Sequence, residues 1–209
     1  MKILIVDDHM LVRQGLKQII ADEFPQATFG EAGTAAEALK CVHAKKWDVV
    51  LLDLTLPGRG GLDILGEMKM IQARLPVLVL SMHPEAEFAV RVLKAGAAGY
   101  LTKQSAAEEL LSAITKVVAG GRYITASLAE KLADDLARGT TQIPHEELSD
   151  REFQTMRMLA EGKTVKEIGA ALDLSGKTVS TYRARVLEKL RLKSTVELAR
   201  YAVEHGLVE

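Results

Sequence analysis

The sequence contains one cysteine, one tryptophan and a formal net charge of only −1, and each scarcity excludes a class of protein. With Cys41 alone, no disulfide can form within the chain, and no cysteine cluster can bind a metal. Cys41 lies in an apolar helical pattern, so we expect it to pack in the core. No apolar run approaches the ~20 residues of a membrane span, and the first apolar segment runs directly into Asp7 and Asp8. We therefore expect a soluble, cytoplasmic protein.

The first 120 residues alternate strand patterns with amphipathic helix patterns five times. Such alternation predicts an α/β fold with a five-stranded, doubly wound parallel sheet and helices on both faces. The strands are expected at about 2–7, 27–31, 48–53, 76–81 and 97–102.

The central strand pattern ends in an acidic residue. Four consecutive apolar residues, 49–52, precede Asp53, as is typical of a strand buried on both faces of a parallel sheet. Ligands bind at the carboxyl ends of strands in open α/β sheets, so a carboxylate there is a candidate functional group. For a single Asp, a helix cap or a turn would be the commoner interpretation.

Other polar residues are expected at the same sheet edge. Asp7 and Asp8 end the first strand, Ser81 ends the fourth, and Lys103 follows the fifth. Three clustered carboxylates repel one another and need a cation, and oxygen ligands suit Mg²⁺. A lysine and a hydroxyl can bind phosphoryl oxygens, which would make Asp53 a nucleophile toward a phosphoryl donor. Each residue alone could be a cap or a solvated side chain, but four strand ends together favour a site.

The alternation stops after residue 121, and we place three regions along the chain. Residues 1–121 form the α/β domain, residues 122–144 a linker with one helix at 125–138, and residues 145–209 an all-α domain of four helices. These helices are expected at 149–161, 165–172, 176–191 and 194–205. The first begins with a capping box, Ser149 to Glu152.

The third of these helices is basic, because residues 176–193 carry a net charge of +5. A short helix, a tight turn and a second, basic helix are typical of helix-turn-helix proteins, which place the second helix in the DNA major groove. Ser175 can cap it, and Val179, Val186, Leu187 and Leu190 supply a buried face. A solvated basic face without DNA is the alternative. The candidate DNA contacts are Lys177, Thr178, Ser180, Thr181, Tyr182, Arg183, Arg185 and Lys189.

With these residues in place, the first 120 residues resemble the receiver domain of bacterial two-component response regulators. The resemblance implies a flavodoxin-like fold, in which Asp53 accepts a phosphoryl group from a sensor histidine kinase. It also implies that Asp7, Asp8, Asp53 and the backbone carbonyl of Thr55 hold Mg²⁺, and that Lys103 binds the phosphoryl group. Ser81 and Tyr100 match the family's switch residues, and Thr55 and His83 are expected to line the mouth of the pocket.

Residues 148–209 resemble the LuxR-type helix-turn-helix of NarL/FixJ response regulators. The matching segments are 148–152, 162–169, 174–175, 178–179 and 188–190. Ser180 and Tyr182 depart from the family's common Lys and His, so the target sequence is expected to differ. The last helix resembles the family's dimerisation helix, through Thr195, Leu198, Ala199 and Ala202. A two-fold symmetric dimer would read half-sites about 10 base pairs apart.

The sequence therefore predicts a DNA-binding transcriptional response regulator that is switched by phosphorylation of Asp53. The partners implied are promoter DNA, a histidine kinase, a second copy of the chain on phosphorylation, and RNA polymerase as a further candidate. The alternative is a DNA-binding regulator whose receiver is controlled by protein partners. An Asp-dependent phosphatase is disfavoured, because Thr55 stands where its acid/base carboxylate would be, and no P-loop motif occurs. We expect no small-molecule turnover.

Overall fold

The computed structural model describes residues 1–56, 61–82, 85–105, 107–137 and 144–208. The chain divides into two compact units, Met1–Thr140 and Thr141–Glu209, and each is treated by itself. Among the described residues, no helix is long and apolar enough to cross a membrane.

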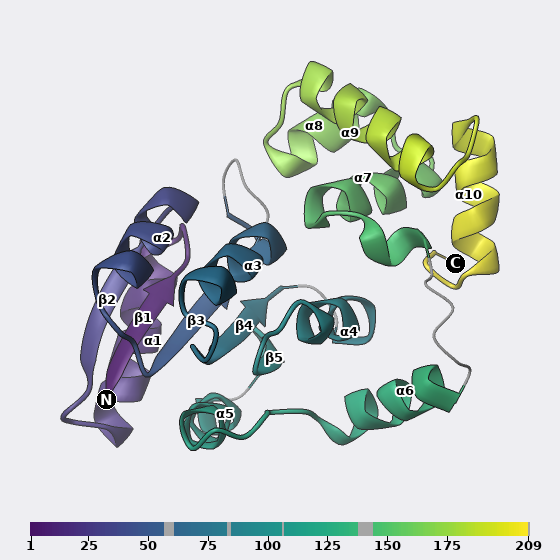
Figure 1. The fold of residues 1–209 in the computed structure, drawn as a ribbon. Coiled ribbons are helices and arrows are strands. Elements are labelled where there is room, and N and C mark those ends of the chain that lie inside the picture. Colours follow the sequence, from purple (N-terminus) through teal and green to yellow (C-terminus); the bar gives the residue numbers. More distant parts are fainter. Residues whose placement is uncertain (57–60, 83–84, 106, 138–143, 209) are drawn as a thin grey trace. The chain divides into compact units, whose positions relative to one another are not determined.

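The first unit is built on the predicted five-stranded parallel sheet, with strand order β2-β1-β3-β4-β5 (Figure 1). The α/β prediction is confirmed, and all four strand pairings are parallel. The strands are β1 (Lys2–Val6), β2 (Thr28–Ala32), β3 (Val49–Asp53), β4 (Val77–Ser81) and β5 (Gly99–Thr102).

Helices cover both faces of this sheet, as the alternation predicts. Helices α1 and α5 pack on one face over a cluster that includes Ile3, Ile5, Val49 and Leu51. On the other face α2 packs against α3, and α4 lies against β5 (Figure 1). The helices are α1 (Met10–Glu23), α2 (Ala35–Ala44), α3 (Gly61–Ile71), α4 (Glu85–Lys94) and α5 (Ala107–Val118).

The chain continues along the first unit after α5. Tyr123 donates its backbone N–H to the carbonyl of Ala98 at 2.8 Å and forms a parallel bridge with Gly99. The Thr125 hydroxyl then donates to Glu85 on α4 at 2.6 Å, and α6 (Ala126–Ala137) packs on α4. The linker proposed at 122–144 thus contains a helix that contacts α4, and residues 138–143 lie outside the described residues.

Trp47 lies just before β3, at the amino-terminal end of that strand. Its indole N–H donates to the carbonyl of Cys41 at 3.0 Å, and Lys45 lies over its ring. Cys41 is only half-buried, so its predicted place in the core is wrong. Its position on α2 gives the indole a carbonyl partner at the margin of the core.

Over residues 144–208 the second unit contains only helices, as predicted, with one additional 3₁₀ turn at η1 (Pro144–Glu147). The predicted capping box is present: Ser149 accepts from the Glu152 N–H, and Glu152 accepts from the Ser149 N–H. Ser175 caps α9 as expected. The helices are α7 (Asp150–Ala160), α8 (Val165–Leu172), α9 (Gly176–Lys189) and α10 (Thr195–Glu204).

Buried side chains orient the basic helix. Val179, Val186 and Leu190 are buried and Leu187 is half-buried, so the predicted inner face of α9 is largely confirmed. Helix α7 packs against both α9 and α10. Asp173 ends α8 in the left-handed conformation, with φ 53°, which turns the chain sharply toward α9.

We expect Gly30→Ala to destabilise the first unit. A Cβ at Gly30 would lie 2.1 Å from a ring carbon of Trp47, and a core that cannot accommodate added volume loses about 1–3 kcal/mol. The measurement is urea unfolding followed by the fluorescence of Trp47, the sole tryptophan. Gly15→Ala on α1 is the control: no atom lies within 4 Å, so stability should rise by up to ~1 kcal/mol. Equal midpoints for Gly30→Ala and the parent would contradict the expectation.

The second unit should lose stability in acid through Glu152. Burial alone would raise the pKa of this carboxyl, but the bonds from Lys189 and Ser149 outweigh it and lower the pKa. A lowered folded pKa stabilises the fold above the unfolded value of about 4.3, and this stabilisation is lost as pH falls through the folded pKa.

Glu152→Gln should therefore cost about 2 kcal/mol at pH 7, with the difference shrinking as pH falls below about 4.3. Helical circular dichroism during urea unfolding reports both units, because both contain helices. Trp47 fluorescence reports the first unit alone and so identifies which transition belongs to the second. Glu188→Gln, on the exposed side of α9, is the control and should behave like the parent. A loss that is independent of pH would contradict the assignment to charge.

Candidate functional site

Two buried carboxylates and one ammonium meet at the carboxyl ends of the strands. Asp7 follows β1 and Asp53 ends β3, and the side chain of each is 2% exposed. The Lys103 ammonium donates to Asp7 Oδ2 at 2.6 Å and to Asp53 Oδ2 at 2.8 Å. The structure thus places side by side three residues that are 46 to 96 positions apart in the sequence.

Strand pairing explains how Lys103 reaches the two acids. The backbone N–H of Lys103 donates to the carbonyl of Ser81 at 2.7 Å, which continues the ladder between β4 and β5 beyond the pair Ser81 and Thr102. Ser81 is itself fully buried. The predicted serine and lysine therefore lie together at one edge, next to the end of β3.

The buried charges shift one another's pKa values. Burial raises the pKa of Asp53 above its usual value, and the bonds from Lys103 and the Thr55 N–H counteract only part of the shift. Burial alone would lower the pKa of Lys103, but its bonds to Asp53 and Asp7 outweigh this and raise it. Lys103 is thus held as an ammonium beside the Asp53 carboxylate, whose charged form would be stabilised by additional positive charge.

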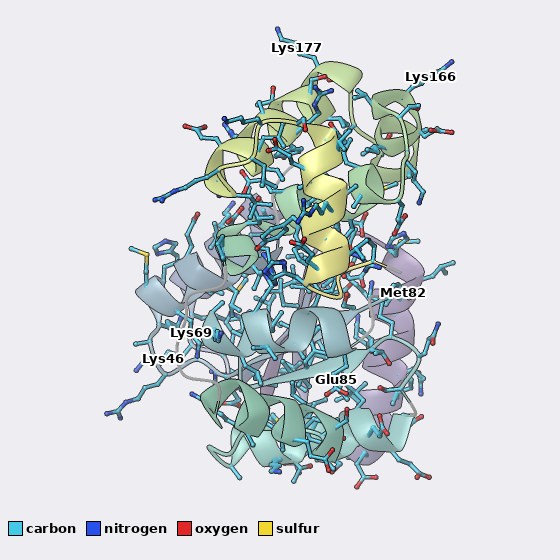
Figure 2. All side chains as sticks on the ribbon, turned by 90° about the vertical axis from the view of Figure 1, so that its right-hand side faces the viewer. Lys46, Lys69, Met82, Glu85, Lys166 and Lys177 are labelled. Carbon is cyan, nitrogen blue, oxygen red and sulfur yellow. The ribbon has the colours of Figure 1, made fainter. Side chains whose placement is uncertain are left out.

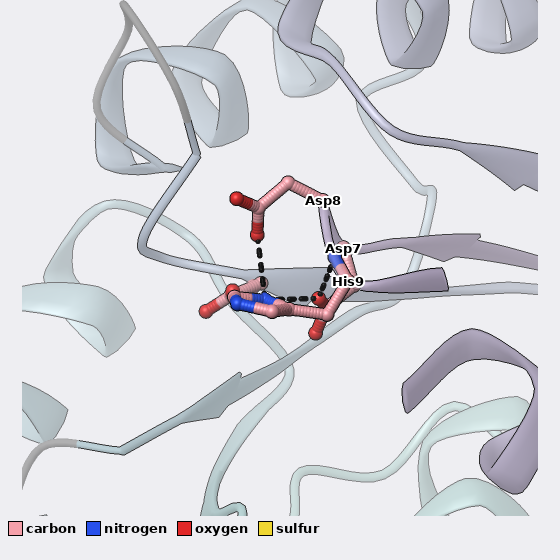
Figure 3. A group of neighbouring side chains, drawn as sticks. Asp7, Asp8 and His9 are labelled. Atoms are coloured by element: carbon pink, nitrogen blue, oxygen red, sulfur yellow. Dashed lines mark hydrogen bonds and ion pairs between the residues drawn. The ribbon is translucent and has the colours of Figure 1, made fainter. Parts of the chain in front are cut away.

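Asp8 and His9 complete the cluster at its exposed side (Figure 3). His9 Nδ1 lies 2.9 Å from Asp8 Oδ1 and 3.2 Å from Asp7 Oδ1. The side chain of His9 is 66% exposed and that of Asp8 29%. Sequence reasoning placed Asp8 here but did not identify His9, although its position directly after the acidic pair was a usable signal.

The donor set fits a divalent cation. Ligand atoms from Asp7, Asp8, His9 and Asp53 all lie within 4.8 Å of one another. Three carboxylates face the single ammonium of Lys103, which leaves about two negative charges to be balanced. Carboxylate oxygens are hard ligands of the kind that Mg²⁺ prefers.

The remaining predicted pocket residues lie around this cluster. The backbone N–H of Thr55 donates to Asp53 Oδ1 at 3.0 Å, so the chain turns directly over the carboxylate. Tyr100 on β5 is 1% exposed. His83 lies outside the described residues.

Arg13 is a further residue that sequence reasoning missed. Its guanidinium donates to the backbone carbonyl of Asp7 at 2.7 Å and to Glu31 at 3.0 Å, and Lys17 donates to Glu31 at 2.7 Å. The bonds from Lys17 and Arg13 lower the pKa of Glu31. Arg13 lies one helical turn after His9. Its bond to the Asp7 carbonyl fixes the backbone directly after β1, where Asp7 stands.

In the second unit, α9 presents a basic surface. Lys177, Arg183 and Arg185 are exposed, and Figure 2 shows Lys177 extending from the helix into solvent. The hydroxyls of Ser180 and Thr181 donate to carbonyls of their own helix, four residues earlier. Thr178 pairs with the capping residue Ser175, and Tyr182 is half-buried.

Lys189 has a structural partner within the unit. Its ammonium donates to Glu152 Oε2 at 2.7 Å, and the Glu152 side chain is only 4% exposed. The same Glu152 oxygen accepts from the backbone of Ser149. Lys189 thus fixes the end of α9 to the start of α7, and its side chain is 38% exposed.

Two of the predicted dimer residues are corrected by the structure. Leu198 and Ala202 are fully buried in the core of their own unit, so they cannot line a surface between two chains. The resemblance to the family's dimerisation helix assigned these two residues to a contact between chains, whereas they pack within one. Val196 and Val203 are the exposed apolar residues of α10, at 80% and 57% exposure.

Comparison with known proteins agrees with both halves of this architecture. Residues 3–115 match the family model of the response regulator receiver domain. Residues 146–202 match the model of bacterial regulatory proteins of the luxR family. A receiver fold with acidic strand ends, followed by a helix-turn-helix unit, defines a two-component response regulator of the DNA-binding class.

Full-length relatives narrow the assignment. The chain is 40% identical over 206 residues to response regulator UvrY of Escherichia coli, covering 98% of this chain and 94% of that protein. It is 42% identical over 209 residues to response regulator GacA of Pseudomonas aeruginosa, covering 100% and 98%. The chain belongs to the LuxR-type response regulators, which are transcriptional regulators.

Solved structures show the same folds. A LuxR-family response regulator from Aurantimonas sp. SI85-9A1 aligns with a TM-score of 0.59 at 34% identity, over 65% of this chain and 97% of that one. RcsB, solved as a complex with DNA, aligns with a TM-score of 0.59 at 25% identity, over 97% of this chain and 98% of that one.

We expect Arg13→Ala to slow phosphoryl acceptance by the receiver about tenfold. The variant removes the hydrogen bond to the backbone carbonyl of Asp7, so the Asp7 carboxylate is no longer held in a fixed position. Intact-mass spectrometry after timed exposure to acetyl phosphate and Mg²⁺ measures the rate. Lys17→Ala is the matched control, since it also loses a bond to Glu31 but leaves the carbonyl held. Equal rates for the two variants would show that the carbonyl contact is unimportant.

Proposed function

We propose that Asp53 is the phosphoryl acceptor of this response regulator and that its phosphorylation controls DNA binding by α9. The observation that carries this proposal is the double ion pair of Lys103 with Asp7 and Asp53 at the carboxyl ends of β1 and β3. A buried carboxylate beside a fixed ammonium suits phosphoryl transfer, which depends mainly on positioning and charge neutralisation.

The donor is a histidine kinase that carries a phosphohistidine. An oxygen of the Asp53 carboxylate attacks phosphorus, a P–O bond forms, and the P–N bond to the imidazole breaks. The imidazole leaves with the electron pair of that bond and takes up a proton from solvent. Lys103 can exchange one of its carboxylate partners for an oxygen of the incoming phosphoryl group, so a positive charge is already in place.

Mg²⁺ is the proposed cofactor, held by Asp7, Asp8 and Asp53 and by the backbone carbonyl of Thr55. The excess of negative charge and the mutual proximity of the oxygens support this assignment. When bound, the cation neutralises charge between the carboxylates and the phosphoryl group. The protein's own contribution is to position the ligands: Lys103 bonds the carboxylates of Asp7 and Asp53, and the Thr55 N–H bonds that of Asp53. Arg13 holds the backbone carbonyl of Asp7.

Ser81 and Tyr100 are the proposed switch residues. Phosphorylation replaces the single negative charge of the Asp53 carboxylate with about −1.5 to −2 on the phosphoryl oxygens, which attracts hydroxyl and ammonium donors from the ends of β4 and β5. Both residues are buried, and they lie on adjacent paired strands, β4 and β5.

Helix α9 is the proposed DNA-reading helix, and double-stranded promoter DNA its partner. Its amino end is capped by Ser175, and its exposed side carries basic residues that can neutralise phosphates. The RcsB complex with DNA supports the assignment by similarity. The proposed contacts are Lys177, Thr178, Ser180, Thr181, Tyr182, Arg183 and Arg185, with Lys189 as a helix anchor and peripheral phosphate contact.

Phosphorylation is proposed to promote a homodimer through the outward side of α10. Val196 and Val203 lie two turns apart on this side, with the half-buried Thr195 and Ala199 near them. RNA polymerase is a further proposed partner at the promoter. The protein would act in the cytoplasm, where promoter DNA is found in bacteria, and would turn over no small molecule.

We expect acetyl phosphate plus Mg²⁺ to dimerise the parent chain and to tighten its DNA binding at least tenfold, a coupling of about 1.4 kcal/mol. Asp53→Asn should show neither effect, because the amide is not a nucleophile for phosphoryl transfer. Mass in solution and DNA affinity at fixed salt are the two measurements. Asp22→Asn, which removes an exposed carboxylate at the end of α1, is the control and should respond like the parent.

Two results would contradict parts of the proposal. Equal DNA affinity of parent and Asp53→Asn under all conditions would leave the helix-turn-helix assignment intact and transfer control to a protein partner. Turnover of a small phosphoester by the parent would instead identify an enzyme.

A further inference from the structure

His9 occupies a position at which a side chain is expected to cap the amino end of α1, but the His9 side chain does not cap it. It is the N-cap residue of α1, with an extended backbone, but its side chain makes no capping hydrogen bond. Residues at this position typically accept a hydrogen bond from the first turn of the helix. The imidazole of His9 instead turns Nδ1 toward the carboxylates of Asp8 and Asp7 (Figure 3).

The backbone holds His9 in this orientation. Its own N–H donates to Asp7 Oδ1 at 2.8 Å, the same oxygen that lies 3.2 Å from Nδ1. One carboxylate thus contacts both the main chain and the ring of His9. The ring lies over the exposed side of the acidic cluster, where an approaching cation would first meet the protein.

We propose that His9 supplies a nitrogen ligand to the divalent cation of this site and thereby makes the site prefer Mn²⁺ to Mg²⁺. The inference rests on the proposed function, which places a cation among Asp7, Asp8 and Asp53. One ring nitrogen of His9 lies within 4.8 Å of a carboxylate oxygen from each of the three acids, and opposite ligands of octahedral Mg²⁺ are about 4.0–4.2 Å apart. The exposed side chains of Asp8 and His9 can close this difference by small rotations.

The chemistry of the ring sets the preference. Mg²⁺ is bound almost entirely by oxygen and water, whereas imidazole nitrogen suits first-row transition metals. A site of three carboxylates alone discriminates weakly between Mg²⁺ and Mn²⁺. Adding one imidazole favours Mn²⁺, because nitrogen strengthens its binding and offers little to Mg²⁺.

Electron spin-echo envelope modulation of Mn²⁺ bound to the full chain tests the ligand directly. We expect ¹⁴N modulation from a directly coordinated imidazole in the parent, and its loss in His9→Gln, which keeps a polar side chain of similar length. His43→Gln is the matched control, because His43 is exposed on α2 and is not part of the cluster. The control variant should keep the modulation.

Calorimetric titration with MgCl₂ and MnCl₂ gives the second measurement. His9→Gln should lower the affinity for Mn²⁺ about tenfold and change that for Mg²⁺ little, so the ratio of the two affinities falls. Mn²⁺ that binds the parent without ¹⁴N modulation, or an unchanged ratio, would overturn the role of His9 alone. Absence of any Mn²⁺ or Mg²⁺ binding, or binding that survives Asp53→Asn unchanged, would overturn the proposed cation site itself.

Discussion

The ion pairs that Lys103 makes with Asp7 and Asp53 depend on the parallel pairing of four strands. In a parallel sheet the carboxyl ends of β1, β3, β4 and β5 lie at one edge, so acids from two strands and a lysine from a third can meet. The hydrogen bond from the Lys103 N–H to the Ser81 carbonyl then sets how far the ammonium extends. The Lys103 ammonium is shared by the carboxylates of Asp7 and Asp53, so the negative charge at this edge exceeds the positive charge. This excess is the reason why the edge attracts a further cation.

A related arrangement stabilises the helical half of the chain. Glu152 is almost fully buried, yet its carboxylate caps α7 and accepts the ammonium of Lys189 from the end of α9. A buried charge with two donors costs little, whereas one that loses a donor becomes expensive. The angle between these two helices is therefore fixed by a polar contact in addition to the apolar packing of Val179 and Val186. The exposed side of α9 remains available for a ligand.

The sequence predicted the sheet, the helix order and the pocket acids because these depend on local periodicity and on one topological rule. Asp53 and Lys103 could be placed together only because parallel strands end at one edge. Arg13 and His9 were missed, since their roles arise from side-chain contacts with backbone and carboxylate atoms that no periodic pattern encodes. Leu198 and Ala202 were assigned to a dimer through the resemblance to the family's dimerisation helix, which does not distinguish the residues of that helix that pack within one chain from those that remain exposed. The 3₁₀ turn at η1 carries no periodic signal at four residues.

The segment after α5 bears on where the chain can be divided. Tyr123 extends the hydrogen bonding of the sheet beyond β5, and Thr125 joins α4 through Glu85. A Cβ at Gly99 would lie 2.8 Å from the carbonyl oxygen of Tyr123, so this glycine accommodates a closely packed neighbour. An isolated receiver that ended at residue 121 would expose the edge of β5 and the side of α4 on which α6 packs. A truncation after α6 keeps these surfaces covered and is the sounder boundary for separating the halves.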